Sequence, residues 1–339
     1  MVAVSADHRF DLGRFPLASG QVLEGAQLSY RVLGCPTATA DNLVLYPSSY
    51  GAWPEDIDWV VGPILDPARW CVVLVSQFGN GRSSSPSNGG GWWGCGRWPV
   101  THADNVRAQR RLLEEVFGVE APALIYGWSM GAQQGYHWAV LEPDRCRRLL
   151  ALCGTARTTP HNRLFLLSLR QALTADPAWN GERFEGEPLR GLRAFACIYA
   201  SWAASQAHYR GLSLEAGGWS DLEDHVERAW LPLYRRHDPH DLLAMIDTWW
   251  ASDVAMASGC GGDLAAALGR VSAAVTVMAG SHDLYFLPDD CAAEAALING
   301  ARFELLPSTL GHRAGNPRDD PALQLRIRAA LEALLDRSC

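Results

Sequence analysis

The sequence lacks the features by which membrane, nucleic-acid and metal-binding proteins are usually recognised. It has no run of about 18 apolar residues, which a spanning helix needs, and its opening MVAVSADHRFD has no apolar signal core. The formal net charge is −8 and basic residues form no clustered stripe, which argues against a nucleic-acid partner. The nine cysteines are scattered, without CxxC or Cys/His metal spacing. We therefore expect a cytoplasmic protein with reduced thiols, no membrane contact and no metal.

The composition is that of a globular protein with a sizeable core. Hydrophobic residues make up 48% of the chain and charged residues 19%. The length of 339 residues fits one large α/β domain or two ordinary ones. Apolar runs predict buried strands at 42–46, 70–76, 123–126, 148–153, 274–279 and 302–306, and a hairpin-like pair within 22–33. Helical spacing predicts helices at 104–117, 132–141 and 321–335.

Continuous apolar strands that alternate with helices indicate a parallel sheet covered on both faces. Between about 160 and 268 the strand signals vanish, and aromatic-rich helical stretches replace them. The sequence therefore predicts one α/β core interrupted by a helical lid. The expected division is 1–159 for the first part of the core, 160–268 for the lid, and 269–339 for the second part of the core.

The segment GWSMG, residues 127–131, matches the nucleophile elbow of α/β hydrolases. In that motif a serine occupies a tight strand-to-helix turn, and the flanking glycines leave room for the backbone. Here a short apolar strand precedes the motif and a helical pattern follows it. We expect Ser129 to be the nucleophile, the alternative being a glycine-rich turn with an idle serine.

A serine hydroxyl needs a base and an orienting carboxylate, which in this fold follow in the order serine, acid, histidine. Asp283 follows the expected strand at 274–279, and His312 follows the strand at 302–306. His282 competes for the role of base, but it neighbours the acid and would lie on the wrong loop. We therefore expect Asp283 and His312 to complete a catalytic triad.

Two other carboxylates compete with the expected acid. Asp289 and Asp290 open the next helix, where they are better explained as capping residues.

The oxyanion formed during acyl transfer also needs two N–H donors. One should be Met130, directly after the nucleophile. The other should lie in the loop PSSYG, with Ser49 preferred over its neighbours Ser48 and Tyr50.

At these residues the chain resembles the homoserine O-acetyltransferase family and its esterase relatives within the α/β hydrolases. The resemblance covers nearly the whole chain. It is densest in THADNVRAQRRLLEEVFGVEAPALIYGWSMGAQQGYHWAVLEPDRC, TPHNRLFLLSLRQALTADPAWNGERF and SHDLYFLPDD. The resemblance assigns the triad roles to the same three residues, and it implies that 160–268 covers the active site as a lid.

The chain departs from the transferase pattern at two places. Where the transferases have a glycine-rich loop of the kind LGGxxGSTGP, this chain has FGNGRSSSP at 78–86. Where they have an aspartate after the catalytic histidine, which helps to hold the amine of the substrate, this chain has Arg313. A cation at this position should repel an α-ammonium group and favour an anionic or neutral acceptor.

Four residues are candidates for substrate binding: Trp128, Arg157, Tyr209 and Arg313. Arg157 follows a strand near the elbow, where it would either anchor an anionic group or form an ion pair at the base of the lid. Tyr209, like Trp202, Trp249 and Trp250, would either line an apolar acyl pocket or belong to the core. The cluster HDPHD at 237–241 suggests a metal site or a helix start, and the proline favours the helix start.

These features predict a serine enzyme that hydrolyses a small ester or thioester through an acyl-enzyme, without a cofactor. The first alternative is an O-acyltransferase that uses acetyl-CoA as co-substrate and an alcohol other than homoserine as acceptor. The second is a non-catalytic ligand-binding protein on a hydrolase fold. We expect a small acyl substrate as the partner, with a homodimer as the alternative to a monomer.

Overall fold

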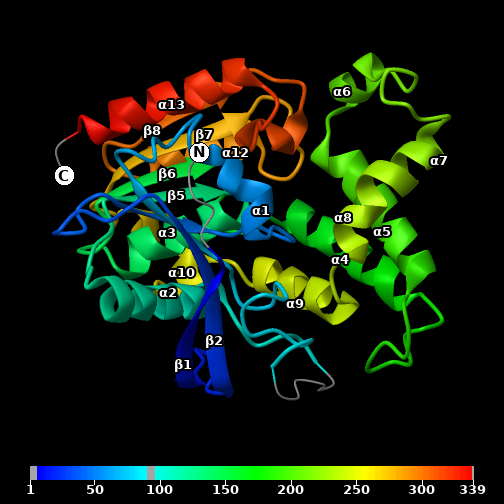
Figure 1. Ribbon diagram of the computed structural model, residues 1–339, viewed down its shortest axis with the longest axis horizontal. Helices are drawn as coiled ribbons and strands as arrows, with labels where there is room; N and C mark the ends of the chain where they lie inside the picture. Colours follow the sequence, from blue (N-terminus) through cyan, green and yellow to red (C-terminus); the bar gives the residue numbers. More distant parts are fainter. Residues whose placement is uncertain (1–5, 90–95, 338–339) are drawn as a thin grey trace.

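The computed structural model describes residues 6–89 and 96–337, which fold around one mixed β-sheet (Figure 1). Its eight strands lie in the order β1-β2-β4-β3-β5-β6-β7-β8. β2 is antiparallel to both β1 and β4, and the remaining neighbours are parallel. The strands are β1 (His8–Pro16), β2 (Val22–Leu33), β3 (Leu43–Pro47), β4 (Cys71–Val75), β5 (Leu124–Trp128), β6 (Arg148–Leu152), β7 (Ala274–Gly280) and β8 (Arg302–Leu306).

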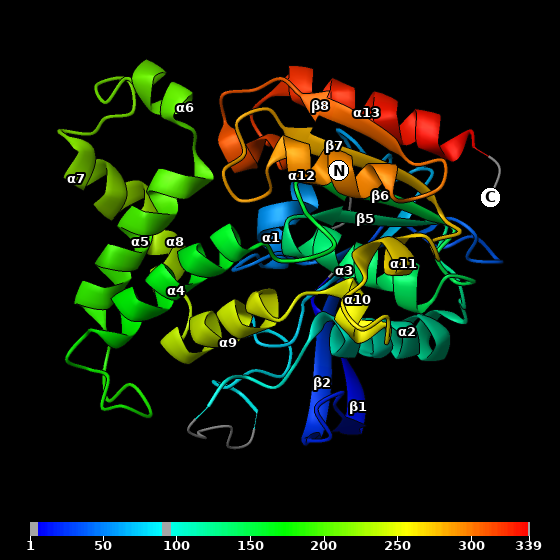
Figure 2. The same ribbon diagram turned by 180° about the vertical axis from the view of Figure 1, so that it is seen from behind.

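The central strands are buried on both faces, as their continuous apolar sequences require. In β3, Val44 and Leu45 belong to two separate apolar clusters, because successive side chains of a strand point to opposite faces of the sheet. Helices α2 (His102–Phe117) and α3 (Met130–Leu141) contribute to one cluster, and α13 (Pro321–Leu335) contributes to the other. Figures 1 and 2 show these helices on opposite sides of the sheet.

The chain segment between the neighbouring strands β6 and β7 is built from helices. They are α4 (Pro160–Thr174), α5 (Leu189–Ala203), α6 (Gln206–Gly211), α7 (Leu222–His225), η2 (Val226–Trp230), α8 (Leu231–Arg235), α9 (Pro239–Trp250), α10 (Val254–Ala257) and α11 (Leu264–Leu268). Both views place α5, α6, α7 and α8 together at one end of the sheet, whereas α10 packs against α3 (Figure 2). The remaining elements are α1 (Pro54–Ile57), η1 (Asp58–Val60), α12 (Pro288–Ala296) and η3 (Gly311–Gly315).

The α/β-hydrolase architecture predicted from the sequence is confirmed, with one error at the start of the chain. Residues 22–33 form the single strand β2 rather than a hairpin, and β2 pairs with β1, which was not predicted. β1 has the sequence HRFDLGRFP and is mostly exposed at the sheet edge, so it lacks the apolar run that identifies a buried strand. No helix in the described ranges is long and apolar enough to cross a membrane.

Candidate active site

The sharp turn between β5 and α3 carries Ser129 at its centre. Ser129 has φ 57° and ψ −126°, a conformation that is unfavourable for a residue with a side chain. A Cβ atom at Gly131 would lie 2.4 Å from the carbonyl oxygen of Pro47, and one at Gly127 would lie 2.5 Å from that of Gly131. Glycine is therefore required at both positions, at Gly131 because the turn packs tightly against the end of β3 and at Gly127 because the turn folds back on its own backbone.

Ser129, His312 and Asp283 form a continuous hydrogen-bonded chain. His312 Nε2 lies 2.9 Å from Ser129 Oγ, and His312 Nδ1 lies 2.8 Å from Asp283 Oδ2. All three side chains are buried. An Nδ1–H that donates to the carboxylate leaves Nε2 with a lone pair to accept the serine proton, which is the arrangement that a general base requires.

The acid is held in place by backbone groups of the loop that follows β7. The carboxylate oxygen Oδ1 of Asp283 accepts hydrogen bonds from the amides of Tyr285, at 2.8 Å, and Phe286, at 3.1 Å. Its other oxygen is thereby free to face His312. The competing histidine, His282, lies at the surface and contacts Ser281 Oγ and the carbonyl of Ser308. Asp289 and Asp290 lie in the first turn of α12, but the N-cap residue is Leu287 and no side chain caps the helix, so the expected capping role is not seen.

Aromatic rings surround the imidazole of His312. The ring of Trp128 stacks on it at 5.2 Å between centroids, and the Trp128 Nε1–H donates to the His312 carbonyl at 3.3 Å. Tyr285 meets the imidazole edge-on at 4.8 Å, and Phe286 lies at 5.5 Å. These contacts fix the ring plane and keep water from its faces.

Two peptide segments next to Ser129 offer backbone N–H groups. Met130 begins α3, so its amide has no acceptor within the helix and lies at the positive end of the helix dipole. In the loop after β3, the Ser48 amide donates to the Val75 carbonyl at 2.8 Å and is therefore occupied. Among the described residues, no acceptor takes the amide protons of Ser49 or Tyr50, and both residues line the pocket in front of Ser129.

The pocket in front of Ser129 has a volume of about 360 Å³. Much of its wall is aromatic, formed by Tyr50, Trp128, Tyr199, Trp230 and Tyr234. Trp128 was predicted from the sequence as a binding residue, whereas the other four were not predicted as pocket residues. The spacing of Trp230 and Tyr234, four residues apart in AWLPLY, was an available signal, because it places both on one helix face.

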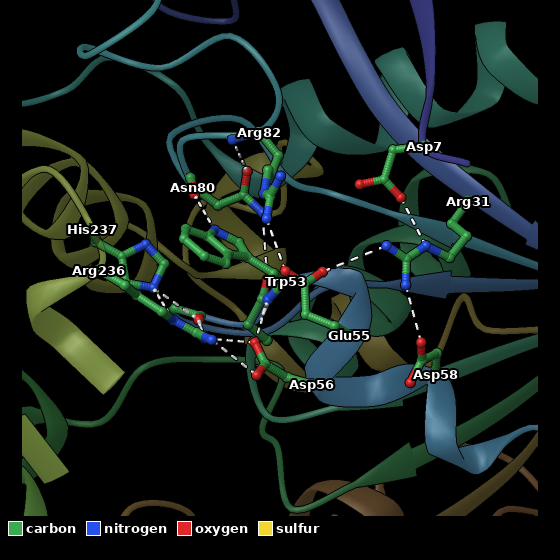
Figure 3. A network of polar contacts seen from close by, with 12 residues as sticks. Asp7, Arg31, Trp53, Glu55, Asp56, Asp58, Asn80, Arg82, Arg236 and His237 are labelled. Carbon is green, nitrogen blue, oxygen red and sulfur yellow. Dashed lines mark hydrogen bonds and ion pairs between the residues drawn. The ribbon is translucent and has the colours of Figure 1, made fainter. Parts of the chain in front are cut away.

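A polar network borders the pocket beside the loop that follows β3 (Figure 3). Arg236 binds Asp56 at 2.5 and 3.0 Å and donates to the Gly51 carbonyl at 2.8 Å, so its charge is compensated. The indole of Trp53 has Arg82 at 4.2 Å and Arg236 at 4.4 Å from its centroid. The end of α8 is thus joined to the loop that carries Ser49.

The four candidate binding residues separate into two groups. Trp128 and Arg313 line the pocket, and the Arg313 guanidinium lies 5.9 Å from the Trp230 ring and pairs with no carboxylate of the described residues. Arg157 lies outside the pocket wall and forms an ion pair with Asp253, at 2.8 and 3.3 Å, which is the second of its two expected roles. Tyr209 also lies outside the wall, where its hydroxyl donates to the Ala200 carbonyl at 2.9 Å.

Trp202, Trp249 and Trp250 also lie outside the wall of this pocket. Trp249 is fully buried and stacks on Phe286 in the core. Trp250 lies beneath the guanidinium of Arg97, and Trp202 packs against Phe165. They are explained as packing residues of the helical segment.

The HDPHD segment begins a helix. The carboxylate of Asp238 caps α9 by accepting from the His240 amide at 2.8 Å, and His237 Nε2 lies 3.0 Å from the Gly51 carbonyl. In the described ranges, the one group of three metal-capable side chains is Cys153, Asp283 and His312. Asp283 and His312 are already hydrogen-bonded to each other. Burial raises the pKa of the Cys153 thiol well above its usual range, which disfavours the thiolate that a metal needs.

Comparison with known proteins identifies the family of the chain. The family described as alpha/beta hydrolase fold matches residues 43–312. An ethyl acetate hydrolase from Pseudomonas veronii is 37% identical over 308 residues, which cover 89% of this chain and 88% of that protein. The solved structure of the acetyl esterase MekB is 35% identical, with a TM-score of 0.92 and coverage of 98% and 97%. A homoserine O-acetyltransferase from Thermobifida fusca is less similar, at 29% identity over 335 residues covering 88% and 86%.

Proposed function

Since this chain belongs to the α/β-hydrolase family, we propose that it is a serine esterase that hydrolyses short-chain acyl esters. The observation that carries the proposal is the chain of contacts from Ser129 Oγ through both ring nitrogens of His312 to Asp283. A hydroxyl, a base and an orienting carboxylate in this order are the parts that covalent acyl transfer requires.

In the first half of the reaction, Ser129 Oγ attacks the ester carbonyl while His312 Nε2 accepts the hydroxyl proton. The carbonyl oxygen becomes an oxyanion, which accepts hydrogen bonds from the Met130 amide and from the amide of Ser49 or Tyr50. The tetrahedral intermediate then collapses. His312 returns the proton to the departing alkoxide, and the alcohol leaves the acyl group on Ser129. Asp283 stabilises the imidazolium that exists between these two proton transfers.

In the second half, water takes the place of the alcohol. His312 accepts a proton from the water as its oxygen attacks the acyl-serine, and a second oxyanion forms in the same site. Collapse of this intermediate releases the carboxylic acid and returns the proton to Ser129. Every proton in both halves moves through the Nε2 atom of one histidine.

The pocket supports a small, uncharged or anionic substrate. Its volume of about 360 Å³ is near the lower end of the range for small-molecule sites, and bulky aromatic rings form its wall. Arg313, next to the catalytic histidine, disfavours an amine at the pocket. The names of the two esterases compared above indicate acetyl esters as the substrate class. Cytoplasmic location and homodimer assembly stay predictions from the sequence.

An O-acyltransferase that uses acetyl-CoA is the second candidate, because a homoserine O-acetyltransferase is similar along most of the chain. The two functions differ in what resolves the acyl-enzyme. p-Nitrophenyl acetate and acetyl-CoA should each be tested as acyl donors, with the acyl-enzyme detected by intact-mass spectrometry and its decay followed with and without added alcohols. An esterase is expected to turn over p-nitrophenyl acetate in water alone.

Homoserine provides the sharper test of acceptor binding. We expect that homoserine does not accelerate acyl-enzyme decay in the wild type, and that Arg313→Asp improves the response by restoring a counter-charge for the amine. Arg326→Asp, an exposed site on α13, is the matched control because it changes the net charge equally. Rapid formation of O-acetylhomoserine from acetyl-CoA by the wild type, with negligible ester hydrolysis, would establish the transferase instead.

A further inference from the structure

Three glutamine side chains are fully buried beneath the loop that follows β3. Gln77 follows β4, Gln109 belongs to α2, and Gln134 belongs to α3. A buried amide without partners costs roughly 1–3 kcal/mol by mutational measures. The NH₂ group of each glutamine has an acceptor, whereas Gln77 Oε1 has no donor among the described residues. Their partners converge on two carbonyls of the same loop.

Gln134 is the last member of a directed chain of hydrogen bonds. Trp138 Nε1–H donates to Gln109 Oε1 at 2.8 Å, and Gln109 Nε2–H donates to Gln134 Oε1 at 2.6 Å. Gln134 Nε2–H then donates to the Ser48 carbonyl at 3.0 Å. All three donors point the same way, so each hydrogen bond polarises the next and the last carbonyl receives the summed effect.

The Ser48 carbonyl and the Ser49 N–H belong to one peptide unit. The unit is planar and trans, so its C=O and N–H point in opposite directions. When Gln134 holds the carbonyl from the α3 side, the N–H is aimed away from α3, and the electron density drawn to the oxygen makes the N–H a stronger donor. Ser49 itself lines the pocket in front of Ser129.

The next peptide unit is held in the same manner. Gln77 Nε2–H donates to the Ser49 carbonyl at 3.1 Å, and this unit carries the N–H of Tyr50. The backbone N–H of Gln77 donates to Ser48 Oγ at 2.9 Å, which adds a second contact between the two loops. The two open N–H groups of this loop, those of Ser49 and Tyr50, therefore each belong to a peptide unit whose carbonyl is held by a buried glutamine.

We propose that Gln134 and Gln77 are positioning residues for the oxyanion site, acting through the Ser48–Ser49 and Ser49–Tyr50 peptides. This inference rests on the proposed ester hydrolysis. The oxyanion exists in the transition state and not in the bound ester, so disturbing its donors lowers kcat and leaves KM little changed. Removal of one oxyanion donor costs about 10²- to 10³-fold in kcat, and a donor that is misaimed rather than absent should cost roughly 10- to 100-fold.

Gln133 provides a matched control on the same helix. It is as fully buried as Gln134, but its amide donates to Thr158 Oγ1 at 3.2 Å and its oxygen faces His102 Nε2 at 3.4 Å. Gln133→Met removes the same kind of buried hydrogen bonds as Gln134→Met, without touching the loop. The two variants should lose similar stability and differ in catalysis.

The experiment measures kcat and KM for p-nitrophenyl acetate with Gln134→Met, Gln77→Met and Gln133→Met, together with inhibition by a trifluoromethyl ketone, whose serine adduct carries an oxyanion. We expect at least one of Gln134→Met and Gln77→Met to lower kcat and weaken the inhibitor by roughly 10- to 100-fold, with KM within about threefold of wild type. A larger effect from Gln134→Met assigns Ser49 as the donor, and a larger effect from Gln77→Met assigns Tyr50. Gln133→Met should keep kcat within about threefold.

Trp138→Phe keeps the ring in the core and removes the first donor of the chain, so it tests the same idea if a glutamine variant does not fold. It should lower kcat by a smaller factor, roughly 2- to 5-fold, and weaken the ketone in parallel. The inference is overturned if Gln134→Met and Gln77→Met both keep the kcat of the wild type. If these two variants do not fold, a wild-type kcat in Trp138→Phe overturns it. An equal loss of kcat in Gln133→Met also overturns it. Failure of the proposed function is distinct, because the wild type would then not hydrolyse the ester.

Discussion

Replacing Ser129 by glycine should leave the protein inactive but more stable than replacing it by alanine. Both changes remove Oγ and its hydrogen bond to His312, so they differ in the backbone alone. At φ 57° and ψ −126° a residue with a Cβ atom is strained, and such strain costs about 1–3 kcal/mol. Alanine retains this strain, and glycine relieves it.

An effect on the unfolded state partly offsets the stability that Ser129→Gly gains from relief of the strain. Glycine has more freedom than alanine in the unfolded chain, which lowers stability by about 0.4–1 kcal/mol. The difference between the two effects leaves Ser129→Gly roughly 1 kcal/mol more stable than Ser129→Ala. Urea unfolding at fixed pH measures this difference directly, and both variants should lose at least ~10³-fold in kcat for p-nitrophenyl acetate.

Ala329→Gly is the control for the glycine effect. Ala329 is exposed on α13, and glycine in a helix interior should lower stability by roughly 0.5–1 kcal/mol. The opposite sign at Ser129 is what the strained turn predicts. If Ser129→Gly is equal to or less stable than Ser129→Ala, the turn is not strained. If Ser129→Ala retains more than about a tenth of wild-type activity, Ser129 is not the nucleophile.

The remaining predictions concern the other triad members and one buried carboxyl. His312→Ala should match the loss seen in Ser129→Ala and Asp283→Asn should be somewhat milder, since the acid only orients and stabilises the imidazolium; inactivation by His282→Ala instead of His312→Ala would contradict this. Burial raises the pKa of Glu294 from 4.5 to about 8. Between these values the folded protein keeps a proton that the unfolded chain releases, so wild-type stability should fall as pH rises, by at most ~1.4 kcal/mol per unit relative to Glu294→Gln. Urea unfolding at several pH values tests this, and a pH-independent difference between the two proteins would contradict it.

The parts of the fold that were predicted correctly are those with strong local signals. Buried parallel strands such as β4, with the sequence CVVLV, need apolar side chains on both faces and so form uninterrupted runs. Ser129 was selected from the GWSMG motif after a short apolar strand, and Asp283 and His312 were selected from the loops that follow two later predicted strands. The structure brings their side chains within hydrogen-bond distance of one another.

The features that were missed depend on contacts between distant segments. The pocket wall combines Tyr50 from the core with Tyr199, Trp230 and Tyr234 from the helical segment, and no local pattern links them. The same holds for Gln109 and Gln134, whose role depends on the contact between α2 and α3. A hydrogen bond between two glutamine side chains leaves no periodic pattern in the sequence. It can be identified only from the relative positions of the two helices in the structure.

The position at which the helical segment leaves the sheet has an evolutionary consequence. Residues 160–268 depart after β6 and return at β7, two strands that lie side by side in the sheet. The ion pair between Arg157 and Asp253 closes this segment near its base. Insertions and substitutions within it can therefore reshape the substrate-facing wall while the strand register and the proposed catalytic side chains stay in place. One scaffold can in this way be diversified into enzymes for different esters, or for alcohols instead of water, by variation of a single continuous stretch of gene.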